Sequence, residues 1–207
     1  MTDAFVLPMF PLGSVLFPNG VLPLHVFEPR YRALVADCLA ADARFGVVLI
    51  ERGHEVGGGD TRFPIGTVTQ IVQVAELPDG RFGLVTVGVE RVAVQEWLPD
   101  DPYPRALVSV RADPEPGRDA TGAVEAARDA LVRVHALRAE LGLPAHEGVV
   151  LVSDDVTLAS YEAAILAPLG PLDAQSLLEV DDAVDRLERT ADLVASEIEI
   201  LRFRRSG

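Results

Sequence analysis

The sequence predicts an α+β protein, in which a β-rich first part of residues 1–112 precedes a helical second part of residues 113–207. Two observations carry this prediction. Short apolar runs separated by turn residues fill the first part, which is typical of a small β-sandwich or barrel. Apolar residues recur at three- and four-residue spacing through much of the second part, which is typical of helices. A stretch rich in proline and charge, residues 113–118, separates the two patterns.

The first thirty or so residues alternate short apolar runs with prolines. Because proline has no N–H to donate and its φ is fixed, this pattern predicts short edge strands and corners rather than one long strand. We expect strands at 5–10, 15–17 and 22–27, followed by a helix at about 29–41.

The remainder of the first part predicts further strands and turns. Residues 66–76 alternate imperfectly between apolar and polar side chains, which indicates a strand with a bulge. Asp79-Gly80 is a strong hairpin signal. Triple glycine predicts a loop at 57–60. The other expected strands are 45–50, 81–87, 90–97 and 103–110.

The second part predicts helices at 121–141, 158–167 and 182–205, with a short one after 171–173. Gly142 is expected to end the first of them. Residues 147–152 fit either a strand or a buried loop. The pairs Asp154-Asp155 and Asp181-Asp182 precede helices, where carboxylates cap free N–H groups.

The last helix carries an apolar seam at alternating three- and four-residue spacing. We expect this seam to pack within the domain rather than in a dimeric coiled coil, because it is only about three heptads long. Its residues are Val184, Leu187, Ala191, Val194, Ile198 and Leu201.

Composition excludes several functions. The formal net charge of −14 disfavours non-specific binding to nucleic acid or anionic membranes. All 18 basic residues are arginine, and without lysine there is no Walker A loop, Ser-Lys dyad or Schiff-base enzyme. A signal peptide and an apolar run of about 20 residues are both missing. We therefore expect a cytoplasmic protein that does not contact a membrane.

No motif indicates catalysis, and neither a cofactor nor a metal is expected. His54-Glu55 and His146-Glu147 lack the second histidine of a zinc motif, and Gly13-Ser14 lacks the second glycine of a nucleophile elbow. Cys38 is expected to be a buried structural thiol, and His25 a hydrogen-bonded core histidine.

Several segments resemble the N-terminal substrate-binding domain of bacterial Lon protease. The resemblance is specific at Leu7-Pro-Met-Phe-Pro-Leu-Gly13, Val15-Leu-Phe-Pro18 and Leu22-Pro-Leu-His-Val-Phe-Glu-Pro-Arg-Tyr-Arg32, and weaker between 112 and 157. Further similar segments are 65–71, 88–92, 103–108, 158–161 and 177–188. The resemblance implies a PUA-like β pseudo-barrel followed by a helical bundle. In the full protease this domain passes unfolded polypeptides to an ATPase and a Ser-Lys protease, and we expect this chain to be a stand-alone, non-catalytic member.

The leading hypothesis is a module that binds exposed apolar polypeptide segments, as an adaptor or regulator in protein quality control alongside a protease or chaperone. Short edge strands could accept an extended peptide by β-augmentation. The alternatives are an RNA-binding PUA-like module, disfavoured by the acidic charge, and a small-molecule module, as in the related cereblon. The candidate peptide-binding residues are Phe10, Phe17, Phe63 and Trp97, and among the aromatic residues Trp97 is the first choice for an exposed one; the oligomeric state stays open.

Overall fold

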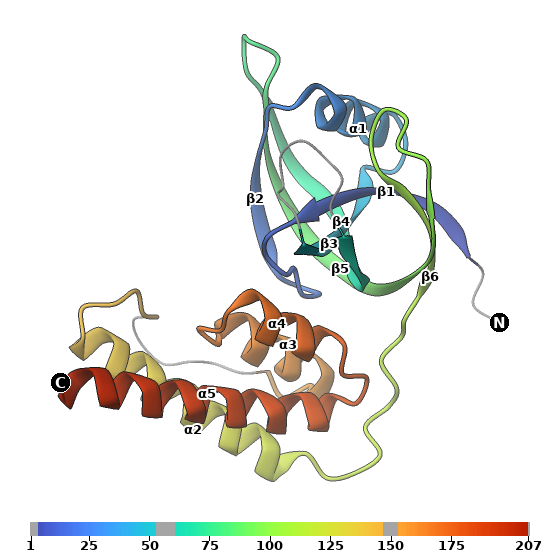
Figure 1. Cartoon of the computed structure of the whole chain (residues 1–207). Helices are drawn as coiled ribbons and strands as arrows, with labels where there is room; N and C mark the ends of the chain where they lie inside the picture. The colour runs from blue at the N-terminus through green and yellow to red at the C-terminus, as the bar shows by residue number, and fades with distance from the viewer. Residues whose placement is uncertain (1–3, 53–60, 147–152, 207) are drawn as a thin grey trace. The chain divides into compact units, whose positions relative to one another are not determined.

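A computed structural model describes residues 4–52, 61–146 and 153–206. The chain divides into two compact units, residues 1–112 (unit 1) and 113–207 (unit 2), and each is described by itself (Figure 1). The described residues form six strands and five helices, which confirms the predicted α+β class. The expected loop at 57–60 and the ambiguous segment 147–152 lie outside the described residues.

Unit 1 is a six-stranded sheet in which five strands close into a ring. The strand order is β2-β5-β4-β3-β1-β6, and β6 also pairs with β5. The ring is therefore β1-β3-β4-β5-β6, and β2 joins it through β5. All pairings are antiparallel except that of β1 with β3. The elements are β1 Phe5–Leu12, β2 Val21–Val26, α1 Pro29–Ala40, β3 Arg44–Arg52, β4 Thr61–Glu76, β5 Phe82–Leu98 and β6 Arg105–Val110.

Two long strands allow the ring to close. β4 shifts register at Val68/Thr69 and again at Ile71/Gln73, which confirms the bulge expected there. The two strands expected at 81–87 and 90–97 are instead one strand, β5, whose first half pairs with β2 and whose second half pairs with β6. Bulges bend a strand and increase its twist, so one strand can serve two neighbours. The turn between β4 and β5 contains Gly80 at φ +76°, as the hairpin signal predicted.

The strand expected at 15–17 is absent, and this segment is irregular, leads into a turn at Pro18 and Asn19, and packs on the ring. Thr67 donates its hydroxyl to the Leu16 carbonyl at 2.6 Å, so a side chain replaces a ladder bond. A Cβ on Gly88 would lie 2.2 Å from the Phe17 carbonyl oxygen, so the turn approaches β5 as closely as only glycine allows. Tertiary contacts therefore override the local strand preference.

Helix α1 packs against β1 and β3 and covers the main core of unit 1 (Figure 1). Its apolar face, including Tyr31, Leu34 and Cys38, is buried together with Phe10 and Phe45. The Cys38 thiol donates to the Arg44 carbonyl at 3.1 Å. Burial first, and then the charges of nearby aspartates, raises the pKa of Cys38 to about 12. The prediction of a buried structural thiol is confirmed.

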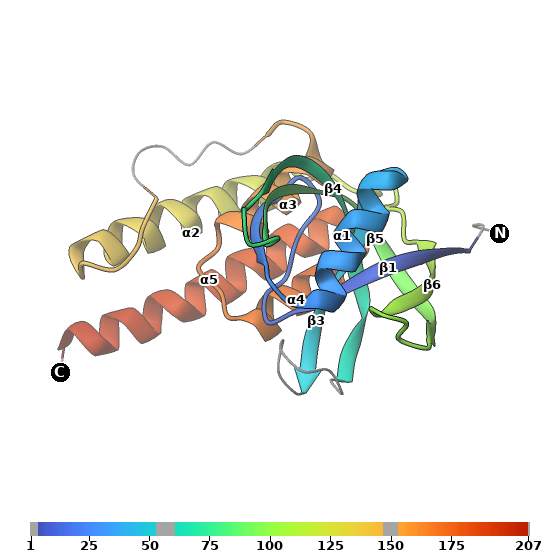
Figure 2. The same ribbon diagram turned by 90° about the horizontal axis from the view of Figure 1, so that it is seen from above.

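Unit 2 contains four helices, α2 Thr121–Glu140, α3 Val156–Leu166, α4 Pro171–Leu178 and α5 Ala183–Ser206, of which α2, α3 and α5 share one core. Helices α2 and α5 lie side by side (Figure 2), and the predicted seam of α5 is buried between them and α3. The seam thus packs within the unit, as expected. Gly142, at φ +66°, follows α2, while Asp155 and Asp182 accept backbone N–H groups at the starts of α3 and α5.

A buried ion pair joins the first residue of unit 2 to its helices. Arg186 of α5 is fully buried and donates to Asp113 at 2.7 Å and to the Ser160 hydroxyl at 2.6 Å. The Tyr161 hydroxyl also donates to Asp113, and the Arg186 guanidinium lies 4.1 Å from the Tyr161 ring centre. This network could not be predicted from the sequence, because its members are far apart in the chain. In the described part of the chain no helix is long and apolar enough to cross a membrane.

Candidate functional site

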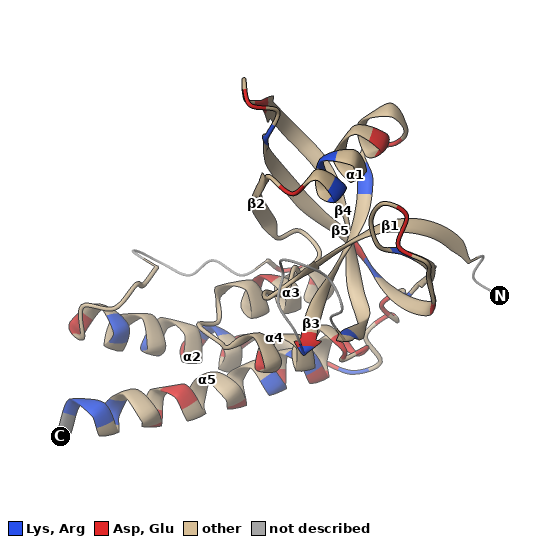
Figure 3. Cartoon of the chain, turned by 45° about the horizontal axis from the view of Figure 1, so that its top comes forward, with Lys and Arg blue, Asp and Glu red and all other residues tan. Residues whose placement is uncertain are grey.

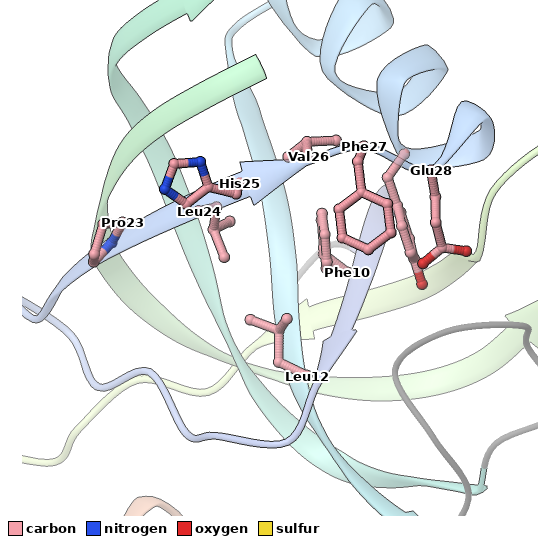
Figure 4. Close-up of a pocket in the computed structure, with 9 residues that line it drawn as sticks. Phe10, Leu12, Pro23, Leu24, His25, Val26, Phe27 and Glu28 are labelled. Carbon is pink, nitrogen blue, oxygen red and sulfur yellow. The ribbon is translucent and has the colours of Figure 1, made fainter. Parts of the chain in front are cut away.

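Two adjoining grooves flank strand β2. The first, here called the aromatic groove, has a volume of about 200 Å³ and is lined by Phe10, Leu12, Pro23, Leu24, His25, Val26, Phe27, Glu28 and Tyr31 (Figure 4). The second, here called the outer groove, has a volume of about 610 Å³ and is lined by Pro23, Leu24, His25, Gln73, Val74, Ala75, Gly83, Leu84 and Val85. Both grooves share three consecutive residues of β2, so this strand is the centre of the site.

The floor of the aromatic groove is a rigid aromatic stack. The rings of Phe10 on β1 and Tyr31 on α1 lie 4.1 Å apart at an angle of 13°. Phe45 packs against Phe10 from below, at 5.9 Å between ring centres. Because Phe10, Tyr31 and Phe45 are buried in the main core, the floor is preformed.

One exposed aromatic stands at the mouth of this groove. Phe27 is 55% exposed, and Figure 4 places its ring beside Phe10. The local sequence explains its position, because β2 ends at Val26 and Pro29 begins α1, with Glu28 in an extended conformation between them. Because the chain changes direction between β2 and α1, the side chain of Phe27 points away from the core.

The lining of both grooves is nearly free of charge. Apart from His25, Glu28 is the single acidic or basic lining residue, and its carboxylate accepts from Arg30 Nε at 3.1 Å. The Arg30 guanidinium also lies 4.5 Å from the centre of the Tyr31 ring. Strand β2 itself carries no charged residue, whereas charges follow α2 and α5 in unit 2 (Figure 3). The site therefore suits uncharged, apolar groups.

Strand β2 has one open edge among the described strands, since it pairs with β5 alone. Three observations show which residues face that edge. Gly88 N–H donates to the Gly20 carbonyl at 2.9 Å, and Thr86 Oγ1 donates to the Leu22 carbonyl at 3.0 Å, so the even-numbered residues face β5. Pro23 has no N–H and fits a position that faces away from the ladder.

By the alternation of antiparallel pairing, Val21, Pro23 and His25 direct their backbone groups to the open edge. This edge offers two N–H donors and three carbonyl acceptors. Proteins commonly protect such edges with charged side chains, bulges or covering segments. Here the edge is six residues long and uncharged, and Pro23 is its one protective feature.

The outer groove lies over the first half of β5. Gly83 keeps its floor open, because a Cβ there would meet only the Ala75 carbonyl, at 4.0 Å. Exposed apolar side chains border it on β4, where Val72 is 52% and Val74 47% exposed. Neighbouring exposed apolar residues of this kind mark interaction surfaces more often than isolated ones do.

Of the four residues predicted to bind peptide, the structure brings only Phe10 to the grooves. Phe17 is buried in the turn after β1, and Phe63 is half-buried on β4. The expectation that Trp97 is an exposed aromatic is wrong. Trp97 is half-buried on β5 under the Arg62 guanidinium, 4.5 Å from its ring centre, whereas Phe27 and Phe203 are far more exposed.

The interpretation of His25 as a core histidine is also wrong, because its side chain is exposed and lines both grooves. Sequence reasoning missed Phe27, Pro23 and Leu24 as site residues. The signal was present, since a proline and a histidine at alternate positions of an apolar run indicate an edge strand with one solvated face. Within the described ranges, no group of three or more histidine, cysteine or acidic residues could hold a metal ion.

A family model describes the chain over nearly its full length. Residues 6–196 match the ATP-dependent protease La (LON) substrate-binding domain. The matched range includes both grooves, the helices α2, α3 and α4, and the first part of α5.

Curated relatives agree with this match. The chain is 32% identical over 205 residues to Lon protease 2 of Myxococcus xanthus and 29% identical over 203 residues to Lon protease 2 of Herpetosiphon aurantiacus. The matches cover 96% and 95% of the chain, and 24% of each relative. The chain thus spans about a quarter of the length of these relatives.

Solved structures share the fold. A Lon N-terminal domain protein from Xanthomonas campestris is 31% identical with a TM-score of 0.64, covering 89% of this chain and 96% of that one. The N-terminal domain of Mycobacterium avium complex Lon protease has the same TM-score at 17% identity, covering 92% of this chain and 98% of that one.

Proposed function

Because this chain belongs to the LON substrate-binding domain family, we propose that it is a non-catalytic module that binds exposed apolar polypeptide segments at the grooves beside β2. One observation carries the proposal: a preformed, nearly uncharged apolar groove lies beside a strand edge that has no partner among the described strands. Unfolded polypeptides expose the two things that this surface complements, apolar side chains and unpaired backbone groups.

The size of the aromatic groove favours a polypeptide over a small molecule. Small-molecule sites have volumes of roughly 300–1,000 Å³ and enclose most of the ligand. At about 200 Å³, the aromatic groove suits a single large side chain. The outer groove is wider but open, so it suits a side chain laid across a surface.

RNA binding is the weaker alternative. Affinity for RNA depends on basic residues that neutralise phosphates. The formal net charge is −14, and the lining of the two grooves holds no arginine. The site has no means of attracting a polyanion.

We further infer that the ring of unit 1 is a PUA-like pseudo-barrel and that unit 2 is a helical bundle. The ring of five strands packed by α1 and the shared core of α2, α3 and α5 support these descriptions. In a cell the module would act in the cytoplasm as an adaptor or regulator that delivers unfolded chains to a protease or chaperone.

The test is binding of a permanently unfolded protein, reduced and carboxymethylated α-lactalbumin, measured by isothermal titration calorimetry. Phe27→Ser removes the exposed aromatic at the mouth of the groove and is expected to weaken binding about tenfold, since a buried phenylalanine contributes roughly 1.5–3 kcal/mol. Phe203→Ser is the matched control, because Phe203 is 82% exposed and lines neither groove. Absence of binding at high micromolar concentration, or equal losses in both variants, would overturn the proposal.

A further inference from the structure

We propose that the bound segment adds to the sheet as an extra strand along the open edge of β2, with alternate side chains divided between the two grooves. This inference rests on the proposed function and specifies the conformation, backbone contacts and side-chain pattern of the segment. The occupant is an extended, uncharged polypeptide segment with apolar residues at alternate positions.

The backbone of β2 provides the first argument. Val21 and His25 present N–H donors to the open edge, and Val21, Pro23 and His25 present carbonyl acceptors there. These groups are spaced as in a strand, so another strand can satisfy them together. With about 3.4 Å per residue, the six residues of β2 accommodate a segment of about six residues.

The two grooves provide the second argument, because beyond β2 the aromatic groove extends to β1 and α1, whereas the outer groove extends to β4 and β5. Figure 4 shows Leu24 and His25 leaving the strand in opposite directions. Leu24 and Val26 belong with the buried core below the aromatic groove, whereas Pro23 and His25 are exposed. Side chains of an added strand alternate in the same way, so one set would enter the aromatic groove and the other would lie over Pro23 and His25.

Charge complementarity selects the chemistry of the segment. The lining of the two grooves holds no aspartate, lysine or arginine; beside His25, its single acidic or basic residue is Glu28, which Arg30 neutralises through the 3.1 Å bond. A charged side chain placed in the aromatic groove would lose its hydration without gaining a partner. The segment therefore has large apolar residues at the positions that face the aromatic stack.

Because of Pro23, the open edge of β2 has fewer hydrogen-bond donors than acceptors. It accepts a hydrogen bond at the centre of the edge but cannot donate one. The segment must therefore supply its own N–H groups at alternate positions, opposite the three acceptors. Blocking an N–H at these positions should weaken binding, whereas blocking the intervening ones should not.

The test uses a fluorescein-labelled peptide of about eight residues in which leucine or phenylalanine alternates with threonine. Single N-methyl groups are placed at each position in turn, and affinity for the full chain is measured by fluorescence anisotropy. We expect losses of about fivefold at every second position and little change between them, because one hydrogen bond contributes about 1 kcal/mol. The peptide scan leaves the protein unchanged, so folding of a variant does not affect it.

Two protein variants test the same edge from the other side. Val21→Pro removes an open-edge donor, and Val21→Ala is its control because it keeps the N–H and changes a side chain outside both grooves. Val21→Pro is expected to bind about fivefold more weakly than Val21→Ala. Pro23→Val adds a donor and is expected to bind the peptide more tightly.

The outcomes distinguish the inference from the proposed function. N-methyl effects without a two-residue period, in a peptide that still depends on its apolar side chains, would overturn strand addition and leave the proposed function standing. Failure of both the peptide and carboxymethylated α-lactalbumin to bind would overturn both. Concentration-dependent dimers in sedimentation that Val21→Pro abolishes would show that the edge serves a second copy of this chain instead.

Discussion

The two halves of β5 lie in contrasting surroundings. Its second half pairs with β6, which also pairs with β1, and this closes the ring. Its first half pairs with β2, which has no second neighbour among the described strands. Trp97 belongs to the closed side and is half-buried, whereas Phe27 belongs to the open side and is 55% exposed. The exposed aromatic residue of the two thus lies beside β2, the strand that has no second neighbour among the described strands.

The largest expected effect is a difference in stability between a variant in the core enclosed by the ring of strands and a variant beside the open edge of β2. Phe45→Ala removes a fully buried aromatic side chain of β3 and should lower the free energy of unfolding by about 3–5 kcal/mol. Phe27→Ala should change it by less than about 0.5 kcal/mol, because the side chain is largely exposed. Urea denaturation measures both, and similar losses would show that Phe27 is part of the folded core rather than of a binding surface.

The second prediction concerns the junction where β2 leaves the ring. In Gly88→Ala the new methyl group would lie 2.2 Å from the Phe17 carbonyl oxygen, so the preceding turn must move. We expect a loss of about 1–3 kcal/mol in stability, together with weaker binding of the unfolded probe. Gly83→Ala is the control for stability, because a Cβ at that position has space. Equal losses of stability in the two alanine variants would contradict the close approach.

The third prediction compares thiol reactivity on the two sides. The pKa of Cys38, raised to about 12 from 9.0, leaves on the order of 1,000-fold less thiolate at neutral pH. Native Cys38 should therefore resist iodoacetamide, whereas a thiol introduced by Phe27→Cys should react readily. Mass spectrometry after timed labelling measures both rates, and rapid labelling of native Cys38 would show that α1 does not seal the core.

The same shift predicts how stability depends on pH. The unfolded Cys38 thiol ionises at lower pH than the folded one, so the unfolded state binds fewer protons between the two values. Its contribution is complete below about pH 9 and is lost as pH rises toward about 12. Cys38→Ser tests this loss, since the variant should show a smaller decline in stability above pH 9.

The smallest expected effect is that of Trp97→Phe. The Arg62 guanidinium lies over the indole, and such contacts contribute about 0.5–1 kcal/mol at partly exposed sites. Stability should fall by no more than that, and affinity for the unfolded probe should stay unchanged. A loss of affinity would place the binding surface beside Trp97, one of the four candidates that the sequence predicted.

Much of the fold could be predicted from the sequence, because local patterns determine it. Proline spacing indicated β2, Asp79-Gly80 indicated the hairpin, and the seam of α5 indicated the core of unit 2. The irregular segment at 15–17 could not be predicted, since its conformation depends on the distant Gly88 and Thr67.

The site was predicted less well than the fold. Of the residues that line the candidate grooves, Phe10 was predicted from the sequence but Phe27 and His25 were not, because exposure along an apolar run depends on which strand edge lacks a neighbour. Trp97 was selected for its residue type, yet ring closure and Arg62 cover it. Strand order is a long-range property, and a single sequence does not display it.

The most direct test of the account is amide hydrogen exchange at β2, followed by NMR with and without the alternating peptide. In the free protein the amides of Val21 and His25 should exchange rapidly, while those of Leu22, Leu24 and Val26 should be protected by β5. Saturation with the peptide should slow exchange at Val21 and His25 selectively. Binding that leaves these two amides exchanging at their free rates would contradict the claim that the open edge of β2 is the recognition site.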